Sequence, residues 1–190
     1  NKFKSCFSFN NMEEYMVKEV FTSERYSILE YTPTIFHPFY NDMEPLGIGK
    51  RIRFFIEWLY GYKVFYLKEK NGGEIVAYCT VTSGKNPRYW FARNKDIIIG
   101  PYFTNPKYRG CGYAGCLVKT VIQELETNWN NAYAYIWKTK IASRKIMESV
   151  GGKFVMNVRN NKLHRLVEKE DGEYAVYKVI KNRKEGKIYE

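Results

Sequence analysis

The segment from Arg109 to Gly115 has residue types suited to binding a phosphate group. It joins an apolar stretch to an amphipathic one, which predicts a strand, a short turn and then a helix. The first amides of a helix have no intrahelical acceptor, and the helix dipole places positive charge beside them. Gly110 and Gly112 lack a Cβ, so the backbone can approach a ligand closely, and Arg109 adds a fixed positive charge. The pattern predicts a pyrophosphate site, with a tight turn that binds no ligand as the alternative.

Two common phosphate-binding motifs do not fit this segment. A P-loop would continue with Gly-Lys and a hydroxyl residue, and none follows. The dinucleotide fingerprint needs three glycines at fixed spacing early in a βαβ unit. Cys111 lies in the turn itself, where we expect a small residue that fits rather than a covalent nucleophile.

The elements around the turn are predicted from apolar periodicity. Asp96 precedes a strand over Ile97–Thr104, whose three consecutive isoleucines indicate burial on both faces. A helix over Tyr113–Glu126 follows the turn and carries a clear apolar stripe. Upstream, Tyr62–Lys68 and Glu74–Thr82 flank a glycine-rich turn and predict a hairpin.

The remaining elements complete a mixed order of strands and helices. Further helices are predicted over Met12–Phe21, Lys50–Tyr60 and Ile141–Val150, and further strands over Tyr26–Tyr31, Ala132–Trp137, Lys153–Val158, Leu163–Glu168 and Tyr174–Ile180. Helices between central strands imply an α/β or α+β sheet covered on both faces. The length of 190 residues favours a single domain, residues 1–190.

Two motifs resemble those of one enzyme family. Arg109-x-x-Gly112-x-Ala114, preceded by Asn105-Pro106-Lys107-Tyr108, resembles the coenzyme A loop of the GNAT superfamily of N-acyltransferases. The segment 141–154 resembles that family's helix after its fifth strand. The resemblance is strongest over residues 50–180, and it makes 1–49 the variable, acceptor-side region. It implies an α+β fold with a mixed, mostly antiparallel central sheet and helices on both faces.

The resemblance also implies a cofactor, a reaction and the residues that serve them. Acetyl-CoA would donate its acetyl group to a small-molecule or peptide amine by direct attack, in an N-acetyltransferase reaction. Residues Tyr102, Phe103 and Thr104 would line the pantetheine arm, and Lys140 and Ser143 would contact the cofactor from the later helix. The pyrophosphate would be held by the backbone amides of Arg109, Gly110, Cys111, Gly112, Tyr113, Ala114 and Gly115.

The groups that move protons are less clear in this chain. Many relatives carry a tyrosine general acid where this sequence has Met147, which cannot transfer a proton. Tyr102, Tyr113 or Tyr135 could replace it, or the thiolate could leave without a dedicated acid. Asp96 is the candidate base, with a solvated carboxylate at a strand end as the alternative. Glu57 is a weaker candidate that a solvated helix face would also explain.

Composition and charge set the classes of function that compete. The net charge of +11 could serve a nucleic-acid partner, a polyanionic cofactor or an acidic substrate, but the charges are spread out, which favours a solvated surface. A coenzyme A-binding module without turnover and a nucleic-acid- or ribosome-associated protein remain the rivals. The aromatic residues in 31–66 and 89–91 predict core and lid packing, with an acceptor pocket as the alternative.

The same composition bears on metals, membranes and location. The four cysteines form no CxxC and do not pair with the two histidines, which predicts free thiols and no metal site. No apolar run approaches the ~18 residues of a membrane span. We therefore expect a cytoplasmic monomer or homodimer without a membrane partner.

Overall fold

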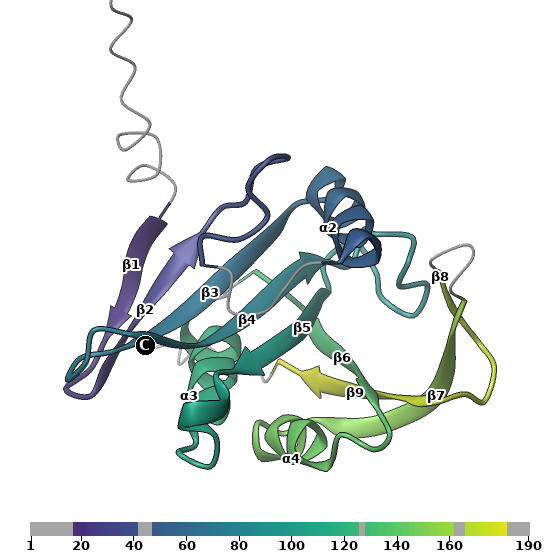
Figure 1. The fold of residues 1–190 in the computed structure, drawn as a ribbon. Helices are drawn as coiled ribbons and strands as arrows, with labels where there is room; N and C mark the ends of the chain where they lie inside the picture. The colour runs from purple at the N-terminus through teal and green to yellow at the C-terminus, as the bar shows by residue number, and fades with distance from the viewer. Residues whose placement is uncertain (1–16, 42–46, 126–127, 162–165, 182–190) are drawn as a thin grey trace, which may run out of the picture. The chain divides into compact units, whose positions relative to one another are not determined.

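The computed structural model describes residues 17–41, 47–125, 128–161 and 166–181 (Figure 1). The chain divides into two compact units, 1–80 with 101–117 and 81–100 with 118–190, and each is described by itself. The chain crosses between the units within β4, within β5 and within α3. Cys6, His164 and the first part of the helix predicted near the N-terminus lie outside the described residues. The prediction of a single domain stays a prediction.

The strands belong to a mixed, mostly antiparallel sheet. They are hydrogen-bonded in the order β1, β2, β3, β4, β5, β6, β9, β7, β8, and the β5–β6 pair is parallel. The predicted α+β class with a mixed sheet is confirmed. The elements are β1 (Val17–Thr22), β2 (Tyr26–Tyr31), α2 (Ile48–Leu59), β3 (Tyr62–Glu69), β4 (Ile75–Ser83), β5 (Ile97–Thr104), the 3₁₀ turn η1 (Pro106–Tyr108), α3 (Tyr113–Thr120), the π-helical turn η2 (Val121–Leu125), β6 (Asn131–Trp137), α4 (Ile141–Ser149), β7 (Lys153–Asn161), β8 (Leu166–Glu168) and β9 (Tyr174–Ile180).

The prediction of a helix over Met12–Phe21 is wrong for the residues that the structure describes. Val17–Thr22 is a strand that pairs antiparallel with β2, from Val17 opposite Tyr31 to Thr22 opposite Ser27. Valine, phenylalanine and threonine favour strands, and pairing with β2 satisfies backbone groups that an isolated helical turn would leave open.

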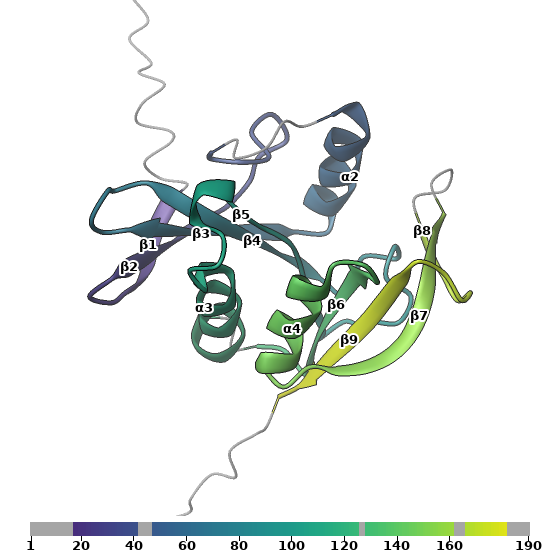
Figure 2. The same ribbon diagram turned by 60° about the horizontal axis from the view of Figure 1, so that its bottom comes forward.

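Aromatic side chains build the core of the first unit. The buried cluster combines residues of β2, β3, β4 and α2: Tyr31, Phe54, Tyr62, Val64, Tyr66 and Tyr78. Helix α2 lies over one face of these strands, as Figure 2 shows. The Tyr62 hydroxyl donates to the carbonyl of Pro38 at 2.9 Å, which ties the segment before α2 to β3. Burial raises the pKa of Tyr62, and the neighbouring Glu57 carboxylate raises it further.

Glu57 does not lie on a solvated helix face, so that expectation is wrong. Its side chain is 0% exposed, and it accepts a hydrogen bond from Arg53 Nε at 2.7 Å, one helical turn earlier. Burying a carboxylate is costly unless it is paired, and the guanidinium supplies that pairing.

The second unit is built around the β6–β9 pair. Asn131 to Trp137 of β6 lie opposite Ile180 to Tyr174 of β9 in antiparallel register. Its buried core includes Tyr89, Ile98 and Val176. The helix predicted to continue regularly to Glu126 instead changes to the π-helical turn at Val121.

Tight backbone packing closes the loop between β4 and β5. The Gly84 amide donates to the Asp96 carbonyl at 2.8 Å, and the Asp96 amide donates to the Arg93 carbonyl at 2.8 Å. A Cβ on Gly84 would lie 2.4 Å from the Arg93 oxygen and 2.8 Å from the Asp96 oxygen. The loop that sets the start of β5 therefore requires glycine at this position.

None of the described helices is both long and apolar enough to cross a bilayer.

Substituting Gly84→Ala should lower the free energy of unfolding by about 1–3 kcal/mol, because backbone atoms must move to admit the methyl group. Gly49→Ala is the matched control, since a Cβ there meets nothing within 4 Å. In α2 that change should stabilise the protein by up to about 1 kcal/mol. Urea unfolding measures both variants, and equal effects would contradict the packing described for the loop.

Candidate anion-binding site

An irregular point in β5 precedes the site. Gly100 has φ +103°, a left-handed conformation inside a strand, and the next residue, Pro101, has no amide to donate. The parallel pairing with β6 covers only Ile97 with Ala132 and Ile98 with Tyr133. Such irregularities redirect a strand's side chains and end its ladder, as is frequent beside active sites.

A short 3₁₀ turn carries the chain from β5 to α3. The Asn105 amide donates to the carbonyl of Val76 on β4 at 2.9 Å, so the end of β5 is tied to the neighbouring strand. The Asn105 side chain accepts a hydrogen bond from the Lys107 amide at 3.1 Å and caps the turn. Asn105 and Pro106 thus end the strand where the sequence predicts.

Beyond this turn, a row of backbone amides has no acceptor within the described part of the protein. These are the N–H groups of Gly110, Cys111, Gly112, Tyr113, Ala114 and Gly115; the Cys116 amide, next in line, donates to the carbonyl of Gly112 at 3.0 Å. Amides at a helix N-terminus attract anions, and the dipole of α3 adds to the attraction.

The two glycines keep the amide row accessible. Gly110 and Gly112 have φ +84° and +79°, a conformation that other residues adopt only with strain. A Cβ at Gly110, Gly112 or Gly115 would meet nothing within 4 Å, so the space on the Cβ side of these three residues is open. The residues present therefore fit an anionic group such as a diphosphate.

The backbone amide of Arg109 was predicted to bind the pyrophosphate, but in the structure it is already hydrogen-bonded. Its amide donates to the Pro106 carbonyl at 3.3 Å, so it does not join the row. Its guanidinium lies over the Phe103 ring, 5.7 Å from the centroid, and its Nε is 3.4 Å from the Thr104 carbonyl. The charge is thereby held beside the end of β5.

Two carboxylates of the β3–β4 hairpin lie beside the site and are engaged by tyrosines. The Tyr108 hydroxyl donates to Glu74 Oε2 at 2.6 Å, and Lys107 Nζ lies 3.7 Å from the same oxygen. The Tyr108 hydrogen bond, followed by the Lys107 charge, lowers the pKa of Glu74. The residue pattern did not predict this contact, although strand order alone would place the hairpin turn beside the end of β5.

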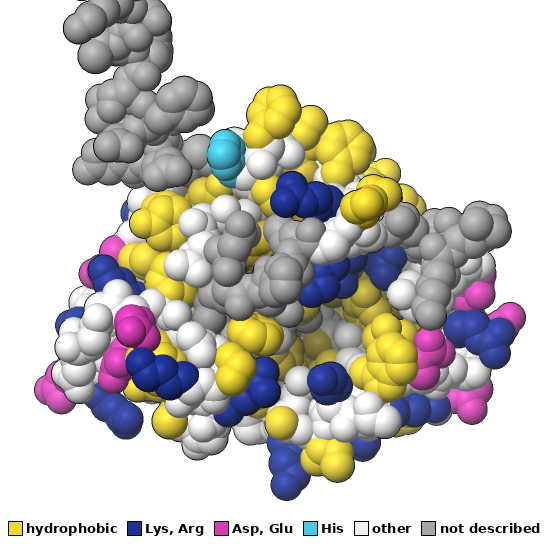
Figure 3. Space-filling model, in the orientation of Figure 1, with side chains coloured by type: hydrophobic (Ala, Val, Ile, Leu, Met, Phe, Trp, Pro, Cys, Tyr) yellow, Lys and Arg dark blue, Asp and Glu magenta, His cyan; other side chains and the backbone are white. Residues whose placement is uncertain are grey.

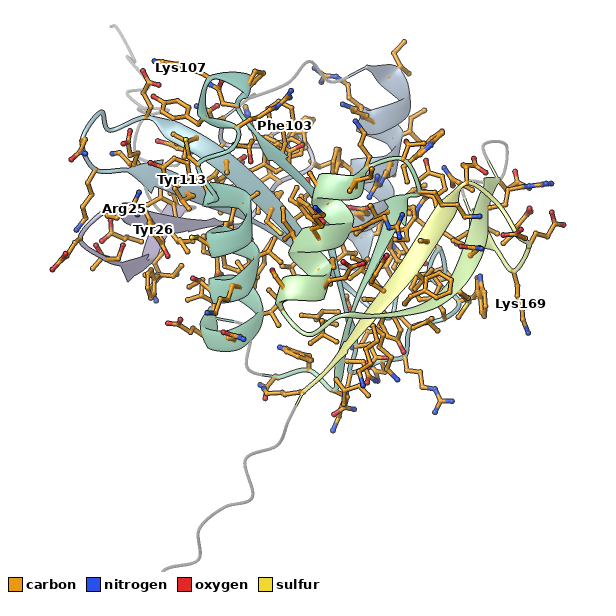
Figure 4. All side chains as sticks on the ribbon, turned by 90° about the horizontal axis from the view of Figure 1, so that it is seen from below. Arg25, Tyr26, Phe103, Lys107, Tyr113 and Lys169 are labelled. Atoms are coloured by element: carbon orange, nitrogen blue, oxygen red, sulfur yellow. The ribbon has the colours of Figure 1, made fainter. Side chains whose placement is uncertain are left out.

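A second tyrosine–carboxylate pair lies at the first residue of α3. The Tyr113 hydroxyl is 3.4 Å from Glu69 Oε1. Burial, and then the Glu69 carboxylate, raise the pKa of Tyr113, while Arg25 of the β1–β2 turn acts in the opposite direction. Figure 4 shows Arg25, Lys107 and Tyr113 at this end of the first unit.

The predicted residues at the end of β5 fall on two sides. Phe103 stacks on Tyr78 with ring centroids 6.0 Å apart and packs against the aromatic core of the first unit. Tyr102 and Thr104 are half-buried and point to the opposite face, because side chains alternate along a strand.

In the second unit, the Asp96 carboxylate is buried and hydrogen-bonded to neighbouring residues. It is 3% exposed, so the solvated alternative is wrong. Its Oδ2 accepts from the Arg93 amide at 2.9 Å, and its Oδ1 accepts from the amide and the side chain of Asn131 at 3.1 and 2.9 Å. The carboxylate joins the loop before β5 to the start of β6.

Tyr135 is the predicted proton donor on β6. Its hydroxyl accepts a hydrogen bond from Arg88 Nη2 at 3.1 Å, and the same nitrogen donates to Asn160 Oδ1 at 3.0 Å. Arg88 is buried, and no sequence motif marked it, because its partners Tyr135 and Asn160 are distant in the sequence.

Helix α4 carries the remaining candidates. Lys140 is exposed at the N-cap of α4, and Ser143 is half-buried in its first turn. Met147 is fully buried, so the position that carries a tyrosine in many relatives supplies no proton here.

The described residues contain no cluster of side chains suited to a metal ion, and their cysteines form no disulfide. No three His, Cys, Asp or Glu side chains gather there in a way that could hold a metal ion. Cys79, Cys111 and Cys116 are free thiols, the first buried and the other two exposed.

Several solved structures resemble this chain in fold. A search of curated proteins finds no match. Among solved structures, an uncharacterized protein from Bacillus halodurans has 14% identity and a TM-score of 0.60, covering 86% of this chain and 90% of its own. An acetyltransferase from Agrobacterium tumefaciens has 16% identity and a TM-score of 0.52, covering 86% and 99%. The microcin C7 self-immunity acetyltransferase MccE, in complex with acetyl-CoA and AMP, has 11% identity and a TM-score of 0.53, covering 83% and 93%.

These similarities to solved structures concern the fold. The family model of the acetyltransferase (GNAT) family matches residues 26–151, more than half of the chain. The match spans β2 to the end of α4 and includes the turn with the row of open amides. The chain therefore belongs to the GNAT acetyltransferase family.

Proposed function

We propose that this protein transfers the acetyl group of acetyl-CoA to an amine acceptor. The observation that carries the proposal is the row of amides from Gly110 to Gly115, which have no acceptor in the described protein and include three glycines where an added Cβ would meet nothing within 4 Å. Family membership and the acetyl-CoA in the MccE complex support the choice of anion. The acceptor belongs to the class of small-molecule or peptide amines.

The binding role of the turn follows from its donors. Each amide would donate to a diphosphate oxygen, and hydrogen bonds to charged groups contribute about 1.5–3 kcal/mol each. The dipole of α3 adds a favourable field at the same place. Arg109, held over Phe103, would add a positive charge at the end of β5.

The end of β5 would orient the pantetheine arm. The irregularity at Gly100 and Pro101 leaves backbone groups outside a regular ladder, where an extended ligand can pair with them. Tyr102 and Thr104 share one face there, and Phe103 contributes its backbone because its ring belongs to the core. Lys140 and Ser143 of α4 stay predicted contacts.

Proton transfer would fall to tyrosines or to solvent. When bound, acetyl-CoA supplies a thioester carbon that the neutral amine attacks, with the thiolate as the leaving group. Tyr102 and Tyr135 are the proposed donors to that thiolate, because Met147 cannot donate. Asp96 is a poor base, because three hydrogen bonds already engage its carboxylate.

Turnover separates this proposal from a module that only binds coenzyme A. Thiol release from acetyl-CoA should require an added amine and should differ among amines in a panel of amino sugars, amino acids, polyamines and peptides. Calorimetric binding of acetyl-CoA without amine-dependent thiol release would assign the module instead. Oligonucleotide binding with a steep salt dependence would favour the nucleic-acid rival. The proposed location is the cytoplasm.

Gly112→Asp should abolish acetyl-CoA binding in calorimetry, because the new carboxylate occupies the open space and repels phosphate. Gly61→Asp is the matched control, since Gly61 also has a left-handed φ (+76°) and a Cβ there also meets nothing within 4 Å. Both variants should lose similar stability through backbone strain, and only Gly112→Asp should lose the ligand. Normal affinity in Gly112→Asp would contradict the site.

Asp96→Asn should lower the free energy of unfolding by about 1–3 kcal/mol. The side-chain NH₂ of asparagine would face an N–H donor at a position where a carboxylate oxygen of Asp96 accepts a hydrogen bond. The dissociation constant for acetyl-CoA and the pH dependence of kcat/KM should stay unchanged. A stable variant with a large loss of kcat and a shifted pH profile would instead identify Asp96 as the base.

A further inference from the structure

Helix α2 turns its apolar stripe outward. Ile48, Ile52, Phe55 and Leu59 recur at the i, i+4, i+7 and i+11 spacing of one helix face, and all are exposed, Ile48 to 80%. The buried positions are Phe54 and the ion-paired Glu57. A helix that only covers a core would bury its apolar stripe and expose its charged residues.

The preceding segment extends this apolar surface. Phe36 is 81% exposed, and Ile35 is also exposed. Figure 3 shows hydrophobic side chains gathered along this edge of the first unit, with basic groups among them. A recess of about 50 Å³ joins the segment to the helix and is lined by Thr34, Ile35, Phe36, Pro38, Arg51, Phe54, Phe55 and Trp58. We call Ile35, Phe36, Ile48, Ile52, Phe55, Trp58 and Leu59 the α2 surface.

The exposed charged side chains that the structure describes on α2 are basic. Lys50 and Arg51 are exposed on the first turn of the helix, and Arg51 also lines the recess. Among the described residues of 31–60, the one acidic side chain is Glu57, which is buried against Arg53. The whole chain carries a net charge of +11. The complement of this surface is therefore apolar and anionic.

We propose that the α2 surface binds an anionic lipid bilayer. The stripe and Phe36 would enter the boundary between headgroups and acyl chains, while Lys50 and Arg51 would lie at the lipid phosphates. Amphipathic helices with aromatic and aliphatic residues on one face and basic residues beside them bind membranes in this way. Basic residues add attraction to anionic lipids.

Other occupants fit the α2 surface less well. A recess of about 50 Å³ is far smaller than the pockets that hold metabolites. In a symmetric contact with a second copy, the basic residues of one copy would lie near those of the other. The sequence expectation of no membrane partner depended on the absence of a spanning stretch, and a helix lying in the interface needs none.

Sedimentation with vesicles tests the proposal on the full chain. The protein should bind vesicles of phosphatidylcholine with phosphatidylglycerol, should bind phosphatidylcholine alone poorly, and should dissociate as salt is raised. The double variant Ile52→Gln, Phe55→Gln should bind the anionic vesicles about ten-fold more weakly. Arg51→Gln should weaken binding to the anionic vesicles alone.

The matched control is Phe154→Gln, Ile180→Gln, which removes one phenylalanine and one isoleucine of β7 and β9 that are more exposed than Phe55 and Ile52, and it should leave vesicle binding unchanged. All variants should bind acetyl-CoA normally in calorimetry. A failure of the membrane proposal would therefore leave the proposed acetyl transfer untouched. No binding to anionic vesicles at low salt, or equal binding by both double variants, would overturn it. Dimerisation in analytical ultracentrifugation that only Ile52→Gln, Phe55→Gln abolishes, without vesicle binding, would assign the surface to a second copy.

Discussion

The proposed function depends on a turn whose backbone amides have no acceptor in the part of the chain that the structure describes. A folded chain normally satisfies its N–H groups, and helix ends do so with caps or water. Here the row from Gly110 to Gly115 begins where the 3₁₀ turn ends and stops at the first helical bond of α3. The left-handed glycines bend the chain so that these amides stay open. An anion with several oxygens satisfies such a row better than isolated waters do, because one group accepts from several amides.

Neighbouring residues engage the carboxylates beside the turn and fix the strand that leads to it. Glu69 and Glu74 lie beside residues of this turn, and the hydroxyls of Tyr113 and Tyr108 engage their carboxylates. At the upstream end of β5, Asp96 and Gly84 fix the loop, and at its downstream end Asn105 is tied to β4. The strand that leads to the turn is thus anchored at both ends, which fits a role in positioning a ligand.

Local signals in the sequence predicted much of the fold. The hairpin and the strand with three isoleucines appear as expected, and the helix after Gly112 begins where predicted, because strong periodicity and glycine turns specify them. The first strand was missed, because residues 17–22 become a strand by forming a hairpin with β2, and the short turn over 23–25 that joins the two strands was not recognised. The burial of Glu57 and Asp96 depends on partners such as Arg53 and Asn131, whose spatial relation only the fold reveals. The turn itself could be predicted because its glycines and the helix after it are contiguous in sequence.

The most direct measurement follows the amides themselves. In ¹H–¹⁵N spectra of the labelled protein, a titration with coenzyme A should shift the amide signals of Gly110, Cys111, Gly112 and the first residues of α3 downfield, since each gains a charged acceptor. Pantetheine, which lacks the diphosphate, should leave those signals in place. Coenzyme A binding with no change in these amides would contradict the account.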